Sequence, residues 1–190
     1  SAGKRLDRAA LLQSLGQCTV DRYAGFQRAA DELAAATATY AAAPGAEGRA
    51  AARAAWERAM DRWQVVDLLR YGPAADFETR GGRGLRASIY AWPDVNRCLI
   101  EEQLVGLRYE GGGLGELSVS TRGLGALEYL LAFDGADNGC APTSQINASG
   151  SWAALSAEER GRRKAAYAAA AAADLQARSR ALLGAWDGAF

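Results

Sequence analysis

The chain contains no histidine among its 190 residues. Histidine is the commonest general base near neutral pH and the commonest ligand for transition metals. Its absence excludes a Ser-His-Asp triad and any zinc site built on imidazole nitrogens. A metal here would depend on oxygen ligands, which suit hard cations. Long hydrophobic runs are also missing, since none approaches the roughly 20 residues of a membrane-spanning helix.

Lysine and cysteine are scarce. Twenty of the 22 basic residues are arginine, and the net charge is zero, so no basic field predicts binding to nucleic acid. The three cysteines, Cys18, Cys98 and Cys140, have no metal-binding spacing. A Cys98–Cys140 disulfide in an oxidising compartment, with Cys18 free, and three unconnected thiols both remain open.

Alanine and glycine are abundant, with 44 and 22 residues. Nearly half of the apolar residues are alanine, so bulky side chains are few and the helices should pack closely over small residues. The length fits one domain, residues 1–190, with enough chain to bury a core.

Apolar residues recur at helical spacing over residues 4–43 and again from about residue 47 to 70. Gly16 and Gly25 predict a bend near residues 16–21 in the first helix. In the second helix Trp63 and Arg70 are seven residues apart and should share a face. The other residues expected to be buried on this helix are Trp56, Met60 and either Val65 or Val66.

Three further helices are expected. Asp94 should cap a helix over 95–108, Ser120 or Thr121 one over about 121–133, and Ser156 with Glu159 forms a capping box for a final helix to about residue 186. Residues 72–93 and 134–150 read as irregular loops. No strand pattern is present, so the sequence predicts an all-α protein, an up-and-down bundle with long irregular loops.

Glu128 is the unusual residue of the segment TRGLGALEYLLAF, residues 121–133. On a helix it shares a side with Leu124 and Leu131, so it should face the core. A buried carboxylate needs an arginine, a hydrogen-bond network or a cation. Gly123 and Gly125 each cost about 1 kcal/mol against alanine inside a helix. They therefore predict a close backbone approach or a ligand-sized gap.

A purely structural role for Glu128, in an ion pair with an arginine such as Arg70 or Arg97, is the simpler alternative. Other charged residues are expected on solvated faces, namely Glu101 and Glu102, and the basic cluster of Arg160, Arg162 and Arg163.

Four segments, in this order along the chain, resemble the imelysin-like family. They are WERAMDRWQVVDLLRYGP at 56–73, IYAWPD at 89–94, GLGALEYLL at 123–131 and the stretch 152–190. The third is similar to the segment that carries the family's GxHxxE signature. The resemblance implies an all-helical bundle exported to the bacterial periplasm or cell envelope. Some relatives are described as insulin-cleaving metallopeptidases and others as iron-regulated or iron-uptake components.

The resemblance also implies an architecture and a set of partners. Family members are usually longer, with a second helical bundle after the first. The chain would therefore correspond mainly to the N-terminal half, with a second bundle or further copies of itself as partners.

Carried over to this sequence, Gly123 matches the first glycine of the signature and Glu128 its glutamate, while Gly125 stands at the histidine position. A zinc peptidase mechanism with two imidazoles cannot be built here, so no catalytic residue is assigned. What remains is an expected pocket at the start of the helix, with Glu128 at its floor as the metal or ligand group. Its wall is expected to contain Arg70, Tyr90, Trp92 and Arg97.

The leading hypothesis is a non-catalytic envelope protein that binds a small ligand, a metal ion or a protein partner, with a link to iron uptake. No cofactor is required by this hypothesis, and iron or calcium at a carboxylate site is the candidate. One alternative is a metal-binding protein or peptidase whose site is completed by a second bundle or chain. The other is a structural interaction module without a ligand.

Overall fold

The computed structural model describes residues 7–186, and none of these residues is in a β-strand. The expected all-α fold is therefore confirmed. No helix of this part is long and apolar enough to cross a membrane. The α-helices are α1 (Arg8–Ala42), α2 (Ala46–Val66), α3 (Arg86–Ile89), α4 (Arg97–Gly106), α5 (Gly123–Ala132), α6 (Gln145–Ala148) and α7 (Ala157–Gly184). Short 3-10 helices cover Gly72–Ala74, Glu110–Glu116 and Val119–Thr121.

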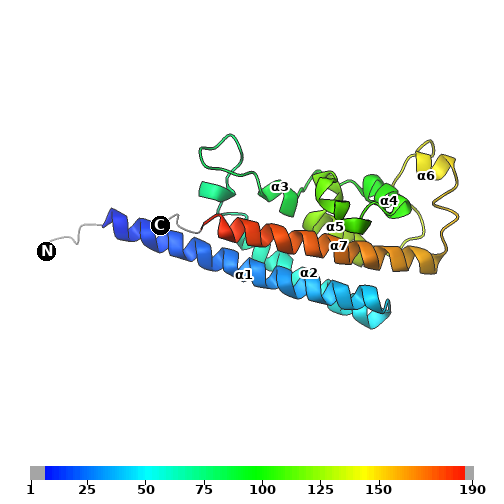
Figure 1. Cartoon of the computed structure of the whole chain (residues 1–190), viewed down its shortest axis with the longest axis horizontal. Helices are drawn as coiled ribbons and strands as arrows, with labels where there is room; N and C mark the ends of the chain where they lie inside the picture. Colours follow the sequence, from blue (N-terminus) through cyan, green and yellow to red (C-terminus); the bar gives the residue numbers. More distant parts are fainter. Residues whose placement is uncertain (1–6, 187–190) are drawn as a thin grey trace.

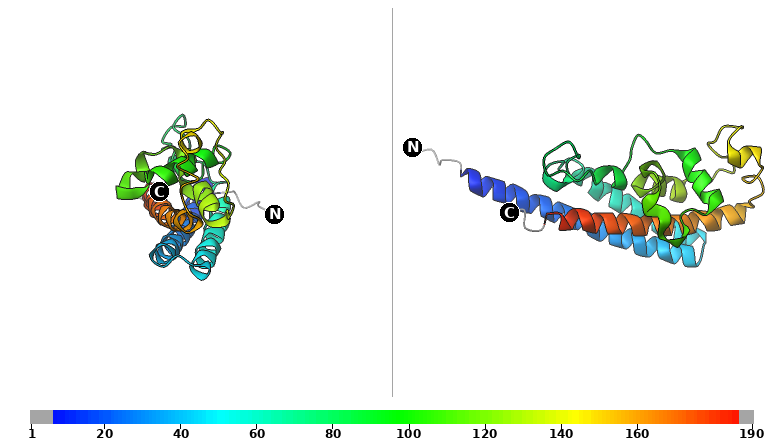
Figure 2. Two further views of the ribbon diagram at one scale, coloured as in Figure 1. Left: turned by 90° about the vertical axis from the view of Figure 1, so that its right-hand side faces the viewer. Right: turned by 45° about the horizontal axis from the view of Figure 1, so that its top comes forward.

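Three long helices form the frame of the molecule. α1 and α2 make an antiparallel hairpin, and α7 returns along α1 in the opposite direction to it (Figure 1). Seen end-on, the three helices lie side by side, and the segment between α2 and α7 covers one side of them (Figure 2). α5 packs against both α7 and α2. The bundle is thus up-and-down, with a ten-residue helix completing its fourth side.

Small side chains make the helix contacts, as the composition predicts. On α7 the four alanines Ala165, Ala168, Ala171 and Ala172 have no exposed surface, and Ala52 and Ala59 on α2 are equally buried. Alanine favours helix and allows backbones to approach closely. The few large residues, such as Phe26 and Trp63, whose ring centroids lie 5.1 Å apart, fill the remaining space.

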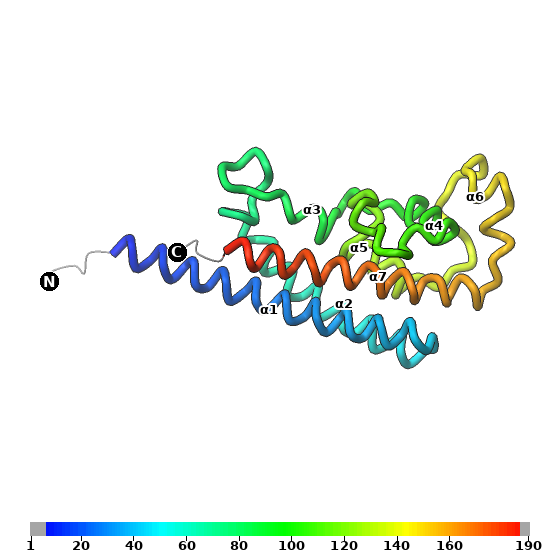
Figure 3. The backbone as a smooth tube through the Cα atoms, viewed as in Figure 1, coloured from blue at the N-terminus to red at the C-terminus, as the bar shows by residue number. Residues whose placement is uncertain are grey.

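The bend predicted near residues 16–21 is wrong. α1 continues without interruption from Arg8 to Ala42 (Figure 3). α1 packs against α2 and α7, and this packing outweighs the cost of about 1 kcal/mol that each glycine carries in a helix.

The second helix ends earlier than expected. α2 stops at Val66, and the carboxylate of Asp67 accepts hydrogen bonds from Arg70 at 2.7 Å and from Arg86 at 2.6 Å. Arg70 therefore does not continue the face of Trp63, and its side chain is 52% exposed. Met60, Trp63 and Val66 are buried as expected, while Trp56 is half-buried.

Two predicted caps are wrong and one is confirmed. Asn96, not Asp94, caps α4, because its side-chain oxygen accepts from the Leu99 amide at 3.0 Å. α5 begins after Arg122 without a side-chain cap, since Ser120 and Thr121 belong to the preceding 3-10 helix. Ser156 accepts from the Glu159 amide at 3.0 Å, as predicted for the start of α7.

Candidate functional site

The two glycines of the GLGALE segment allow close packing at the start of α5. Gly123 has a φ of +70°, and a Cβ there would collide with the carbonyl oxygen of Ile89. A Cβ on Gly125 would collide with the side chain of Val95. The sequence allowed two explanations for these glycines, a close approach of neighbouring residues or a ligand-sized gap. The structure shows the close approach. The space beside Gly125, where the family signature has histidine, is filled by Val95.

Glu128 is exposed, so the prediction that it faces the core is wrong. Ile89 and Val95 cover the first turn of α5, and that cover does not extend to Glu128 one turn later. Leu124 and Leu131 are buried on the same helix, because other elements reach them. Glu128 makes no salt bridge with any residue of 7–186.

Tyr90 is the expected wall residue that lies within electrostatic range of Glu128. Burial raises the pKa of the Tyr90 hydroxyl, and the nearby negative charge of Glu128 raises it further. Arg86 is close enough to oppose this effect, and it is held by Asp67. Burial by itself would raise the pKa of Asp67, but hydrogen bonds from Arg86 and Arg70 bring it below its ordinary value.

The remaining expected wall residues do not form a pocket floored by Glu128. Trp92 is 63% exposed. Arg70 is engaged by Asp67 at the end of α2. Arg97 points into a different cluster, in which it pairs with Glu101 and lies 4.0 Å from the ring centroid of Phe133. Tyr90 thus lies within electrostatic range of Glu128, whereas Arg97 pairs with Glu101.

Among residues 7–186 Glu101 is the one buried carboxylate, with no exposed surface. Its oxygens accept hydrogen bonds from the Tyr129 hydroxyl at 2.6 Å, the Gly139 amide at 2.7 Å and Arg97 Nε at 2.9 Å. A carboxylate in this position needs such partners, because an unpaired buried charge is strongly destabilising. The expectation that Glu101 lies on a solvated face is wrong, whereas the neighbouring Glu102 is half-buried.

The sequence contains a signal for this cluster. Arg97 and Glu101 are four residues apart, and Ile100 and Leu104 share their side of the helix. The sequence predicts that Arg97 can pair with a buried acid, but that acid is Glu101 and not Glu128. Tyr129, the residue that follows Glu128, is the member of the α5 segment that reaches it.

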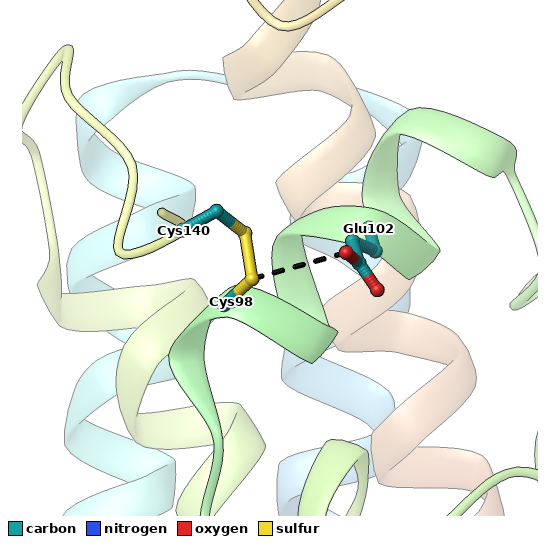
Figure 4. Close-up of side chains that lie close together, drawn as sticks. All are labelled: Cys98, Glu102 and Cys140. Atoms are coloured by element: carbon teal, nitrogen blue, oxygen red, sulfur yellow. Dashed lines mark hydrogen bonds between the residues drawn. A yellow bond between two sulfur atoms is a disulfide. The ribbon is translucent and has the colours of Figure 1, made fainter. Parts of the chain in front are cut away.

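Cys98 and Cys140 form a disulfide that connects α4 to the 134–144 loop, and Cys18 is free and exposed. Figure 4 shows Glu102 beside the bonded sulfurs. Among the described residues, Cys98, Cys140 and Glu102 are the one group of three His, Cys, Asp or Glu side chains close enough to hold a metal ion. Both of its sulfurs are consumed by the disulfide, and Glu128 does not belong to it.

The fold and the α5 segment define the class of this protein: a helical bundle in which one helix begins at a glycine and carries a glutamate five residues later. The imelysin (Peptidase M75) family model matches residues 19–190, so the chain belongs to the imelysin family. No curated protein and no solved structure matches the chain.

Replacing Gly123 by alanine should destabilise the protein by about 2–4 kcal/mol, because alanine is strained at positive φ and its Cβ collides with the backbone of Ile89. Chemical denaturation measures the change. Gly161→Ala in α7 is the matched control, since a Cβ there meets nothing within 4 Å, and it should leave stability equal or higher. Equal effects of the two substitutions would contradict the close approach at Gly123.

Replacing Glu101 by glutamine should lower the free energy of unfolding by about 3 kcal/mol, because all three of its partners are donors and the ion pair with Arg97 is lost. Glu128→Gln should change it by less than about 0.5 kcal/mol, as expected for an exposed side chain. Urea titration of both variants provides the comparison. If Glu128→Gln destabilised the protein more than Glu101→Gln, the result would support a structural role for Glu128 instead.

Proposed function

We propose that this chain is a non-catalytic imelysin-family protein that binds a ligand or protein partner through the surface around Glu128. The observation that carries the proposal is the packing of Val95 against Gly125. Val95 fills the space at the position where the signature has histidine. The signature therefore retains one ionisable side chain, Glu128, and this side chain is exposed. Within residues 7–186 Glu128 belongs to no group of three His, Cys, Asp or Glu side chains close enough to hold a metal ion.

The surroundings of Glu128 support recognition of a positively charged group. Glu128 is an exposed carboxylate within electrostatic range of the half-buried Tyr90, and a cationic ligand that reached both would meet a charge and an aromatic ring. This supports a cationic ligand or a basic segment of a partner better than a bare metal ion, which needs several oxygen ligands. Iron or calcium binding, and the link to iron uptake, remain parts of the proposal that require a second chain or bundle to complete the site.

A periplasmic or envelope location is part of the same proposal. The imelysin family is generally extracytoplasmic. The Cys98–Cys140 disulfide supports it, because disulfides persist mainly in oxidising compartments.

The purified chain should not cleave an unfolded protein substrate faster in zinc, calcium or iron than in a chelator, because no imidazole is present to hold a catalytic metal. Electrophoresis of the substrate after prolonged incubation measures cleavage, and calorimetric titration with calcium and iron measures binding in parallel. Metal-dependent cleavage that disappears in Glu128→Ala would overturn the proposal. Stoichiometric metal binding lost in Glu128→Gln would favour the alternative of a carboxylate metal site.

The N-terminal part of α1 supports association with a second copy of the chain. It extends past the end of α7 (Figure 2), and Leu11, Leu12 and Leu15 on it are 45–54% exposed. Beside them, α1 and α2 border a groove of about 710 Å³. Charges of both signs line this groove, including Asp21 and Arg62. A surface with both signs can pair with itself across a two-fold axis.

Sedimentation over a concentration series should show a reversible dimer. The double substitution Leu11→Glu and Leu15→Glu should weaken it at least tenfold, because it places charge in an apolar contact. Ala51→Glu is the control, because Ala51 is exposed and lies in the N-terminal half of α2, near the α1–α2 turn and away from Leu11 and Leu15. A monomer at every concentration would refute self-association through this surface.

A further inference from the structure

A second polar site lies at the other end of α5, between the first turns of α2 and α7. A cavity of about 160 Å³ is present there. Its charged lining consists of three cationic side chains, Arg49, Arg160 and Lys164, and one acidic side chain, Asp134. The uncharged residues of its lining include Tyr40 and Ala157, the first residue of α7.

Lys164 is the buried member of this group, with 7% of its surface exposed. Its Nζ donates to the carbonyl oxygen of Phe133 at 2.9 Å and lies 4.8 Å and 5.0 Å from the ring centroids of Tyr129 and Phe133. All of these partners are neutral. Burial, followed by the positive charge of Arg49, lowers the pKa of Lys164 to about 8, and the negative charge of Glu101 opposes this effect only in part. Glu101 is hydrogen-bonded to Arg97, Tyr129 and Gly139. Among residues 7–186 the ammonium group of Lys164 therefore has no carboxylate in direct contact, whereas buried ammonium groups are normally paired.

Capping of α5 explains part of this arrangement. Arg49 donates to the carbonyl oxygens of Leu131 and Phe133 at 2.7 Å and 3.2 Å, and Lys164 shares the second of these acceptors. Cations at the C-terminal end of a helix are stabilising. Capping employs one of the three ammonium hydrogens of Lys164, so within the described part of the chain two remain for another acceptor.

Capping does not account for Arg160. Its Nη1 donates to the carbonyl oxygen of Leu155 at 2.6 Å, and its guanidinium group lies 5.6 Å from the Trp152 ring centroid. The remaining guanidinium donors have no acceptor among residues 7–186. The acid of the cavity, Asp134, is 75% exposed and is paired with Arg49. Positive charge is therefore in excess, and it is concentrated around Lys164 and Arg160.

We propose that this cavity binds a small oxyanion, of the size and charge of inorganic phosphate, between Lys164, Arg160 and Arg49. The oxyanion would supply the missing counter-charge and accept the unused N–H groups, and charge-assisted hydrogen bonds of this kind are the strong ones. The first turn of α7 adds the partial positive charge of a helix N-terminus to the same cavity. This site does not involve Glu128 and is independent of the proposal above.

Calorimetric titration of the full chain with sodium phosphate at pH 7 and low ionic strength tests the site. Wild-type protein should bind one phosphate per chain. Lys164→Met and Arg160→Gln should each weaken binding at least tenfold, since each removes a cation from the cavity. Arg162→Gln is the matched control, because Arg162 is on the same helix but is 67% exposed and pairs with Glu159. It should change the affinity less than twofold.

Sulfate and acetate, titrated separately, distinguish the kind of oxyanion. Binding of either with the same dependence on Lys164 and Arg160 supports the site and identifies a sulfate-like or carboxylate ligand. Urea denaturation of each variant confirms that it is folded before titration. The proposal is overturned if no oxyanion binds to wild-type protein, or if Arg162→Gln weakens binding as much as the two cavity variants do.

Discussion

The close approach of helices through alanine and glycine is the constraint on which the rest of this structure depends. Because Ala168 and Ala172 on α7 carry only a methyl group, the backbones of neighbouring helices come near one another, and few large side chains are needed to fill the core. At the start of α5 the approach is closer still, and only glycine fits beside Ile89 and Val95. Where α5 lies, and which of its residues are exposed, follow from that contact.

A helix held so tightly at its first turn places its later residues in fixed positions. Tyr129 reaches the buried carboxylate of Glu101, which also holds Arg97 and the amide of Gly139. The disulfide between Cys98 and Cys140 fixes the same loop next to α4. Hydrogen bonds, an ion pair and a covalent bond therefore hold α4, α5 and the 134–144 loop to one another. This compensates for the small apolar area that alanine-rich helices bury.

The same packing changes what the family signature can do in this chain. A glycine in place of the histidine admits Val95 into the space beside it, and the glutamate is left on the surface beside Tyr90. Positive charge in excess is found instead at the C-terminal end of α5, where Lys164 is buried and donates to the carbonyl oxygen of Phe133. One ten-residue helix thus carries an accessible acid in its middle and borders a recessed cluster of bases at its C-terminal end.

The spacing of residues along the sequence determined the helical class, the extent of α1 and α7 and the Ser156 cap, because each of these depends on residues close together in the chain. The composition excluded imidazole chemistry, because the chain has no histidine. The resemblance of several segments identified the family. Only the tertiary structure decided which acid is buried. Periodicity placed Glu128 with Leu124 and Leu131, but burial depends on whether another segment covers that part of the helix. The cover over α5 comes from residues 89–95, and the partners of Glu101 come from α5 and the 134–144 loop. Contacts between segments so far apart along the chain leave no local periodic signal.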